Sequence, residues 1–337
     1  MNNVTTPPPA VSTVAVGVIA QENSRSRKFA ELATRWSLPL LLVVTLILAA
    51  LTTPGFFSFE NMRGILINTS VIGVAAVGMT AVTLSGNLVS LAVTQQTMLS
   101  ALVFLALLSG GVPIFFALLL TVLALILVGL FQGAFVSAGL NPMITTLAVG
   151  AVIFGGATLG TGGVVVSAPN ADFRWIALSS PLGLPLPIYI FIAFAILVTV
   201  LFDRTILGRE TLLVGANPKT ARLSGLSFSR VTLAAYALLG IGTALAGMIV
   251  AAQTGQVTTE DLPTLTGDVI AAVLVGGTAI QGGFGSPLRS ALGALMIAIF
   301  TNVMVLHDFA HGWRMAAVGA LVVVMVSILH VLRKKVV

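Results

Sequence analysis

The chain has 337 residues, of which 57% are hydrophobic and 8% are charged, and its formal net charge is +6. Soluble proteins carry about 25% charged residues, so this composition excludes an ordinary water-soluble domain. From Gly64 to Ala171 there is no Asp, Glu, Lys, Arg or His, and this stretch has room for about four membrane-spanning helices of roughly 20 residues each. The absence of cysteine excludes disulfides, thiolate metal sites and cysteine catalysis.

The predicted fold is all-α, a polytopic membrane protein with about ten transmembrane helices of roughly 20 residues each. Lipid cannot hydrogen-bond an exposed backbone, and the apolar runs are too long and continuous for the alternating strands of a barrel. In chain order, these runs predict helices near residues 38–57, 64–85, 89–109, 113–138, 142–163, 186–203, 231–252, 265–281, 286–306 and 312–332.

Residues 1–30 are predicted to form a disordered cytoplasmic tail, because they are polar, contain three consecutive prolines and show no apolar face. Their basic cluster follows a weak apolar patch instead of preceding a longer one, so they do not resemble a cleavable signal peptide. Residues 31–337 are then expected to form one transmembrane domain, with a polar loop at residues 203–230.

The distribution of basic residues predicts the orientation in the membrane. They gather before the first predicted helix, after the sixth, after the eighth and at the C-terminal end. By the positive-inside rule, both termini and the loop 203–230 are cytoplasmic, whereas Asp172 and Glu260 face outward. Because the basic residues are spread over loops and not gathered on one face, the positive net charge does not indicate a nucleic-acid partner.

Motifs for ATP hydrolysis, ion coupling and proteolysis are missing from the sequence. No lysine lies in a G-x-x-x-x-G-K-[ST] phosphate loop, so we expect no ATP hydrolysis by this chain and no catalytic residue. Ion-driven carriers usually hold acidic or histidine side chains inside the bundle, and we expect none there. His307 and His311 have metal-compatible spacing but no third ligand except Asp308, so we interpret them as wetted loop residues and predict no metal site.

The polar residues within the predicted helices are small and neutral. A solute path between the second to fifth and seventh to tenth helices has the candidate lining residues Thr80, Asn87, Asn141, Thr146 and Thr266. For each residue alone, a hydrogen bond within its own helix or to a neighbour is the commoner role. Most of the 34 glycines are expected to let helices approach closely, as at Gly156 and Gly160, which lie four apart on one face.

The loop 203–230 contains signals for a short helix. Asn217 as N-cap and Pro218 in the first turn mark its start, and Gly225 marks its end. A helix of barely two turns cannot span a membrane, so it would lie along the surface. An ordinary solvated basic loop fits the composition equally well.

The same loop also carries a longer pattern of G-R, G-x-N, A-x-x-S-G and a final Arg. Its residues are Gly208, Arg209, Gly215, Asn217, Ala221, Ser224, Gly225 and Arg230. Further matches follow at Asp268, in the glycine-rich run 276–285 and at Asn302, and earlier ones lie at Asn141 and Pro142. In these residues the chain resembles the permease subunits of bacterial ATP-binding cassette (ABC) importers for simple sugars, of the ribose, arabinose, xylose and galactose type.

This resemblance implies an ABC importer permease fold in the bacterial inner membrane. A cytoplasmic helix at about residues 217–226 would dock on a separate ATP-binding subunit, which holds ATP and Mg²⁺. The implied coupling residues are Gly215, Asn217, Ala221, Arg222, Ser224 and Gly225. Further implied partners are a periplasmic or extracellular solute-binding protein and a second permease copy, either identical or similar, while this chain itself binds no cofactor.

Departures from the family pattern concern the solute. The family stretch S-G-G-I-D-L-S-V-G corresponds to residues 85–93, where Val89 replaces the acid, and Thr266 stands where the family often has Glu. A path without charges favours a neutral solute such as a pentose or hexose, since a buried charge would lack a counter-charge. A branched-chain amino-acid or nucleoside permease is the alternative, and an ATP-independent secondary carrier is an alternative from a different class.

Overall fold

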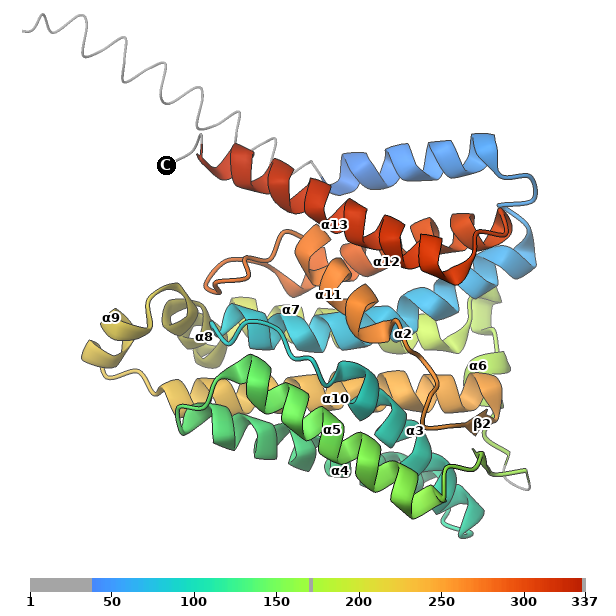
Figure 1. Cartoon of the computed structure of the whole chain (residues 1–337), viewed down its shortest axis with the longest axis horizontal. Coiled ribbons are helices and arrows are strands. Elements are labelled where there is room, and N and C mark those ends of the chain that lie inside the picture. The colour runs from blue at the N-terminus through green and yellow to red at the C-terminus, as the bar shows by residue number, and fades with distance from the viewer. Residues whose placement is uncertain (1–37, 170–171, 335–337) are drawn as a thin grey trace, which may run out of the picture.

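The computed structural model describes residues 38–169 and 172–334, with side chains described up to residue 327, so the predicted tail at residues 1–30 lies outside the described residues. Most helices lie side by side along one direction (Figure 1). The helices are Leu38–Thr52, α2 (Phe59–Leu84), α3 (Val93–Ser109), α4 (Ile114–Ser137), α5 (Pro142–Thr161), α6 (Trp175–Leu178), α7 (Leu186–Arg204), α8 (Ile206–Ala216), α9 (Pro218–Leu223), α10 (Phe228–Thr254), α11 (Leu265–Val275), α12 (Pro287–Leu306) and α13 (His311–Lys334). A short 3₁₀ turn at Pro181–Gly183 and an antiparallel pair of two-residue strands, β1 (Val166–Ser167) and β2 (Gln256–Val257), complete the described elements.

Each of the ten predicted segments contains an apolar helix. Six helices, namely α2, α4, α5, α7, α10 and α12, are long and apolar enough to cross a membrane. The segment Leu38–Thr52, α3, α11 and the part His311–Ser327 of α13 are shorter. The helical, polytopic class is therefore confirmed, with β1 and β2 as a small exception to an all-α fold, whereas the count of ten spans stays a prediction.

Local backbone chemistry explains the main differences from the predicted boundaries. The second helix begins at Phe59 and not near residue 64, because the Ser58 side chain accepts a hydrogen bond from the Asn61 N–H and caps it. The eighth predicted helix extends to residue 281, but α11 ends at Val275. Gly277 has φ 83°, a left-handed conformation that ends a helix.

Helices α2 and α10 form the centre of the molecule. In their most apolar windows, 89% of α2 and 72% of α10 is buried. Glycines let the two backbones approach: a Cβ added at Gly78 would lie 2.9 Å from the Leu238 carbonyl oxygen, and one at Gly242 would lie 2.5 Å from the Val74 carbonyl oxygen. This is the small-residue packing typical of membrane helices.

The predicted packing role of Gly156 and Gly160 is wrong for the single chain. Both lie on α5, and an added Cβ at either position would meet no atom within 4 Å. The spacing does place them on one face of the helix, but that face points to open space, because α5 lies on the outside of the bundle.

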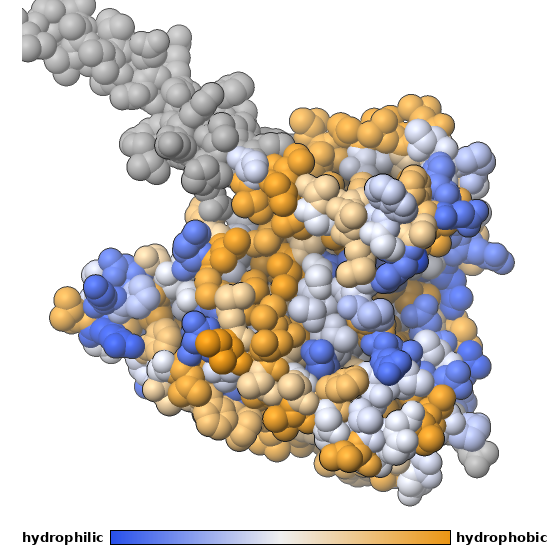
Figure 2. Space-filling model, in the orientation of Figure 1, coloured by the Kyte–Doolittle hydropathy of each residue, from blue (hydrophilic) through white to orange (hydrophobic). Residues whose placement is uncertain are grey.

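The surface has a hydrophobic band between two hydrophilic ends. Figure 2 shows hydrophilic residues over α8 and α9 at the left and along the right side, with hydrophobic colours dominating between them. We call these two ends the α8–α9 end and the α6 end (Figure 1). Helix α4 contributes exposed apolar side chains to the band, among them Phe115, Leu123 and Leu127. Such a band is what a multi-pass membrane protein presents to lipid.

The connection between α2 and α3 is a buried, non-helical segment at residues 85–92. Ser90 donates its N–H to the Met79 sulfur, so the chain turns back beside α2 after Leu84. Irregular backbone at membrane depth is tolerated only where protein or a cavity surrounds it. Because of this reversal, α3 starts at Val93, later than the predicted residue 89, and its first turn lies inside the molecule.

Candidate translocation site and coupling surface

A polar cavity of about 300 Å³ lies among α3, α5, α11 and the segment that precedes α11. Figure 1 shows that α3 and α11 both begin near the middle of the molecule, the second after an inward-running segment that follows β2. Solute sites of many transporters lie near the bilayer midplane where helices are broken in this way. The cavity is lined by Leu91, Thr94, Gln95, Met98, Phe154, Thr259, Glu260, Asp261, Pro263 and Thr266.

Two threonines join the first turns of α3 and α11 at this cavity. The Thr94 N–H donates to the Thr266 hydroxyl oxygen at 3.0 Å, and the Thr266 N–H donates to the Thr94 hydroxyl oxygen at 3.0 Å. The two hydroxyl oxygens are 2.9 Å apart. Each helix therefore caps the other, and the positive ends of two helix dipoles converge on the cavity.

Gln95 lines the cavity and also carries an unpaired acceptor. Its Oε1 atom is buried and has no hydrogen-bond partner among the described residues. A buried polar atom without a partner costs about 1–3 kcal/mol. The neighbouring Gln96 differs, because its Nε2 donates to Gln132 Oε1 at 2.9 Å.

The acidic part of the lining comes from the segment before α11. Asp261 Oδ2 accepts the Thr258 N–H at 2.8 Å, which shapes this segment, and Glu260 beside it is exposed. The cavity thus has carboxylates on one side and the first turns of two helices on the other.

Of the five predicted path residues, Thr266 lines the cavity. Thr146 supports it from behind, because its hydroxyl oxygen accepts the N–H of the lining residue Leu91 at 3.1 Å. Thr80 lies elsewhere: it is fully buried and donates to the Ala76 carbonyl within α2 at 2.7 Å. That Thr80 and Thr146 line the solute path stays a prediction.

The two predicted asparagines also lie outside this cavity. Asn87 donates to the Thr232 hydroxyl at 3.1 Å and so ties the segment after α2 to α10. Asn141 is exposed and caps α5, since its Oδ1 accepts the Met143 N–H. Sequence reasoning missed Thr94 and Gln95 as lining residues, although the pair of glutamines at the start of an apolar helix was a signal.

The expectation of no acidic or histidine side chain inside the bundle is corrected at Asp268. This residue of α11 is half-buried and lines a second cavity together with His311. His307 is exposed, with Nε2 at 3.2 Å from the Thr52 carbonyl oxygen. Within residues 38–169 and 172–334, no group of three or more His, Cys, Asp or Glu side chains could hold a metal ion.

The predicted short helix of the polar loop is present as α9, preceded by a further helix, α8. Asn217 caps α9, with its Oδ1 accepting the Thr220 N–H at 3.1 Å. Ser224 is the C-cap, and Gly225 follows with φ 79°, so the helix ends earlier than residue 226. Ala221 is 5% exposed and packs among apolar residues of α8 and α10 and of the turn between α9 and α10.

The Arg222 guanidinium lies 5.5 Å from the centre of the Phe228 ring at the start of α10. This cation–π contact adds to the packing of Ala221. The predicted coupling residues therefore lie on α9, at its two ends and at the end of α8, at the polar α8–α9 end (Figure 2).

Gly215, at the end of α8, is the point where this surface meets the bundle. A Cβ at Gly215 would overlap the Leu84 carbonyl oxygen at the end of α2 and lie 2.7 Å from the Gly283 nitrogen. Gly283 in turn donates its N–H to the Leu84 oxygen at 3.0 Å. We call the residues Leu84, Gly215 and Gly283 the glycine junction.

From the glycine junction the chain leads to the polar cavity by two routes. The segment 85–92 runs from α2 to Leu91, and the loop that contains Gly283 follows the end of α11, whose first turn holds Thr266. Helix α8 therefore contacts, through Gly215, the backbone of two segments that lead to opposite walls of the cavity.

A helical, membrane-embedded bundle with a polar cavity near its middle and a packed basic helix at one end belongs to the class of transport proteins. The family described as "Branched-chain amino acid transport system / permease component" matches residues 61–327, and the chain belongs to this family.

Individual relatives are similar over nearly the whole chain. The "Ribose import permease protein RbsC" of Haemophilus influenzae is 31% identical over 293 residues, which cover 85% of this chain and 90% of the relative. The "Autoinducer 2 import system permease protein LsrD" of Enterobacter sp. is 29% identical over 297 residues, covering 86% and 90%. RbsC of Escherichia coli K12 is 30% identical over 297 residues, covering 87% and 92%. No solved structure matches. The resemblance to sugar import permeases is confirmed.

Proposed function

We propose that this chain is the membrane-spanning subunit of an ABC importer and moves a neutral monosaccharide or a related small polar solute across the bacterial inner membrane. The observation that carries the proposal is the cavity lining, in which the Gln95 side chain lies together with those of Thr94 and Thr266. Hydroxyl groups both donate and accept hydrogen bonds, so a sugar can satisfy all three side chains without a counter-charge.

The relatives support the same solute class. Two of the three compared proteins are named as ribose import permeases, and the third as an autoinducer 2 import permease. The size of the cavity, about 300 Å³, lies at the lower end of the range for small-molecule sites. A small solute held by few groups fits a site that must also release it.

The energy source is a separate subunit. We place the ATP-binding subunit, with its ATP and Mg²⁺, on α8 and α9 at the cytoplasmic end. The solute-binding protein then docks at the α6 end, and a second permease copy, identical or similar, completes the pore. This arrangement includes the ten predicted spans, with both termini in the cytoplasm. No cofactor on this chain and no enzymatic activity of its own are part of the proposal.

A branched-chain amino acid is the second candidate, and a specific arrangement favours it. Glu260 and Asp261 could face an ammonium group while the first turns of α3 and α11 face a carboxylate. The first-turn N–H groups of Thr94 and Thr266 already have partners, so these two N–H groups are not free to bind a carboxylate. A nucleoside is also neutral, so it needs no counter-charge, but it needs a larger cavity than a monosaccharide does.

The test is uptake into proteoliposomes that contain the permease, its ATP-binding subunit and the cognate binding protein. We expect uptake of radiolabelled pentose or hexose that requires both ATP and the binding protein. Replacing Gln95 with Leu should lower this uptake by about tenfold, because one solute hydrogen bond of about 1.4 kcal/mol is lost. Gln253→Leu is the control, since Gln253 is exposed at the end of α10 and does not line the cavity. ATP-independent uptake, or uptake of an amino acid alone, would refute the proposal.

A further inference from the structure

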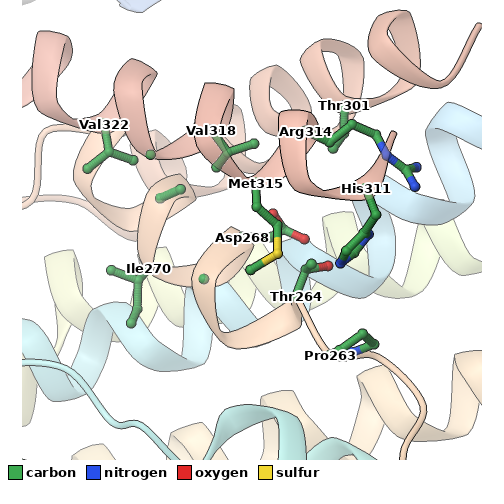
Figure 3. A pocket seen from close by; sticks show the side chains of 13 residues that line it. Pro263, Thr264, Asp268, Ile270, Thr301, His311, Arg314, Met315, Val318 and Val322 are labelled. Atoms are coloured by element: carbon green, nitrogen blue, oxygen red, sulfur yellow. The ribbon is translucent and has the colours of Figure 1, made fainter. Parts of the chain in front are cut away.

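A second cavity, of about 360 Å³, lies between α11, α12 and α13. We call it the α11–α13 cavity. Figure 3 shows that its two ends differ: Thr264, Asp268 and His311 gather at one end, and Ile270, Val318 and Val322 lie toward the other. The polar cavity of the proposed solute path adjoins it at the shared lining residue Pro263, but its other lining residues differ.

Two glycines help to form the α11–α13 cavity, because they have no side chain to fill it. Gly267 on α11 and Gly319 on α13 both line it, and an added Cβ at either would meet no atom within 4 Å. Neither glycine has a positive φ, so the backbone does not require glycine there. In a helix, glycine costs about 0.5–1 kcal/mol relative to alanine. Two such positions facing one space indicate room for an occupant.

The polar end carries both signs of charge. Asp268 is half-buried, accepts a hydrogen bond from Thr264 and lies in the electrostatic field of His311. Arg314, one turn further along α13, has a buried Nε without a hydrogen-bond partner among the described residues, and in Figure 3 its side chain points away from Asp268. The first turns of α11 and α13 add the positive ends of two helix dipoles at the same place.

The apolar end of the α11–α13 cavity lies within the hydrophobic band. Val322 lies eight residues beyond Arg314, which corresponds to about 12 Å along the helix. The residues just before α13, 307–310, are exposed and lie at the α6 end. The cavity therefore extends from a polar surface into the hydrophobic band. A phospholipid in a bilayer has the same arrangement, with its headgroup at the surface and its acyl chains in the hydrocarbon layer.

We propose that the α11–α13 cavity holds one phospholipid whose headgroup combines a phosphate with a primary ammonium group. The phosphate lies between Arg314 and His311, the ammonium group lies against Asp268, and one acyl chain lies along Ile270, Val318 and Val322. A free phosphate would leave the apolar end empty. A choline headgroup has no N–H to donate to Asp268, and a glycerol headgroup brings no positive charge to it.

This lipid site is independent of the solute proposal, so its test does not use transport. The full chain, purified in detergent and stripped of lipid, is mixed with phosphatidylethanolamine, phosphatidylcholine or phosphatidylglycerol. Lipid retention is measured by native mass spectrometry, and thermal stability in the same detergent is measured in parallel. We expect retention of one phosphatidylethanolamine at about tenfold lower concentration than the other two lipids, with a matching rise in the unfolding temperature.

Three variants make the site falsifiable. Asp268→Asn should remove the preference for phosphatidylethanolamine over phosphatidylcholine, and Arg314→Gln should weaken all three phospholipids. Gly319→Leu fills the α11–α13 cavity and should abolish retention while the protein remains folded. The matched control is Gly156→Leu on α5, where an added Cβ also meets no atom within 4 Å and which lines neither of the two described cavities.

Equal retention of the three lipids, or undiminished retention by Gly319→Leu, would overturn the proposal. Loss of a dimer in Gly319→Leu without any change in lipid retention would also overturn it, because the cavity would then belong to an interface between two copies of the chain.

Discussion

Replacing Gly215 with alanine should push α8 and α9 away from the rest of the helix bundle. The new Cβ would overlap the Leu84 carbonyl oxygen and lie 2.7 Å from the Gly283 nitrogen, where ordinary contacts begin at 3.4 Å. All these neighbours are backbone atoms, which cannot rotate away as the end of a side chain can. Helix α8 must therefore move outward by about 1 Å, because interiors are close-packed and accommodate little overlap.

The expected magnitude follows from three contributions. Overpacking of this kind costs about 1–3 kcal/mol. Loss of the hydrogen bond from Gly283 to Leu84 adds about 0.5–1.5 kcal/mol. Alanine in place of glycine returns about 0.5–1 kcal/mol through helix propensity. The clash is larger than the propensity gain, so we expect a net cost of about 0.5–4 kcal/mol.

The assay combines thermal stability in detergent with ATP hydrolysis by the assembled importer. Gly215→Ala should lower the unfolding temperature and should remove the stimulation of ATP hydrolysis by solute-loaded binding protein, while the chain remains in the membrane fraction. Gly160→Ala is the control: it introduces the same change on α5, where an added Cβ meets no atom. If Gly215→Ala matched the control in both measurements, the glycine junction would have no role in coupling.

Two further predictions concern the α8–α9 end and the orientation. Ala221→Trp should displace α9, because Ala221 is 5% exposed within an apolar cluster, and copurification of the ATP-binding subunit should fall at least tenfold with normal membrane insertion; unchanged copurification would remove α9 from the contact. Single cysteines at Asp172 and Pro218, in a chain that has no cysteine of its own, should react with a membrane-impermeant thiol reagent on intact cells at position 172 only. Labelling at 218 alone would reverse the predicted orientation.

The sequence determined the local features of this protein. Apolar runs placed all ten helical segments, because the cost of exposing backbone to lipid depends on the composition of each segment alone. Asn217, Pro218 and Gly225 predicted α9, since helix caps involve neighbours within about four residues. The coupling pattern around these residues was also local, which is why the family resemblance could be noticed first in this loop.

Only the tertiary structure decided which polar groups meet. Thr94 and Thr266 are 172 positions apart and cap each other's helices, and nothing near either residue in the chain specifies that pairing. Likewise, the sequence placed Thr80 among the path candidates, but in the fold its hydroxyl bonds its own helix, whereas Gln95 lines the cavity. A hydroxyl or amide in an apolar helix has several partners of similar energy, and the packing of distant helices selects one of them.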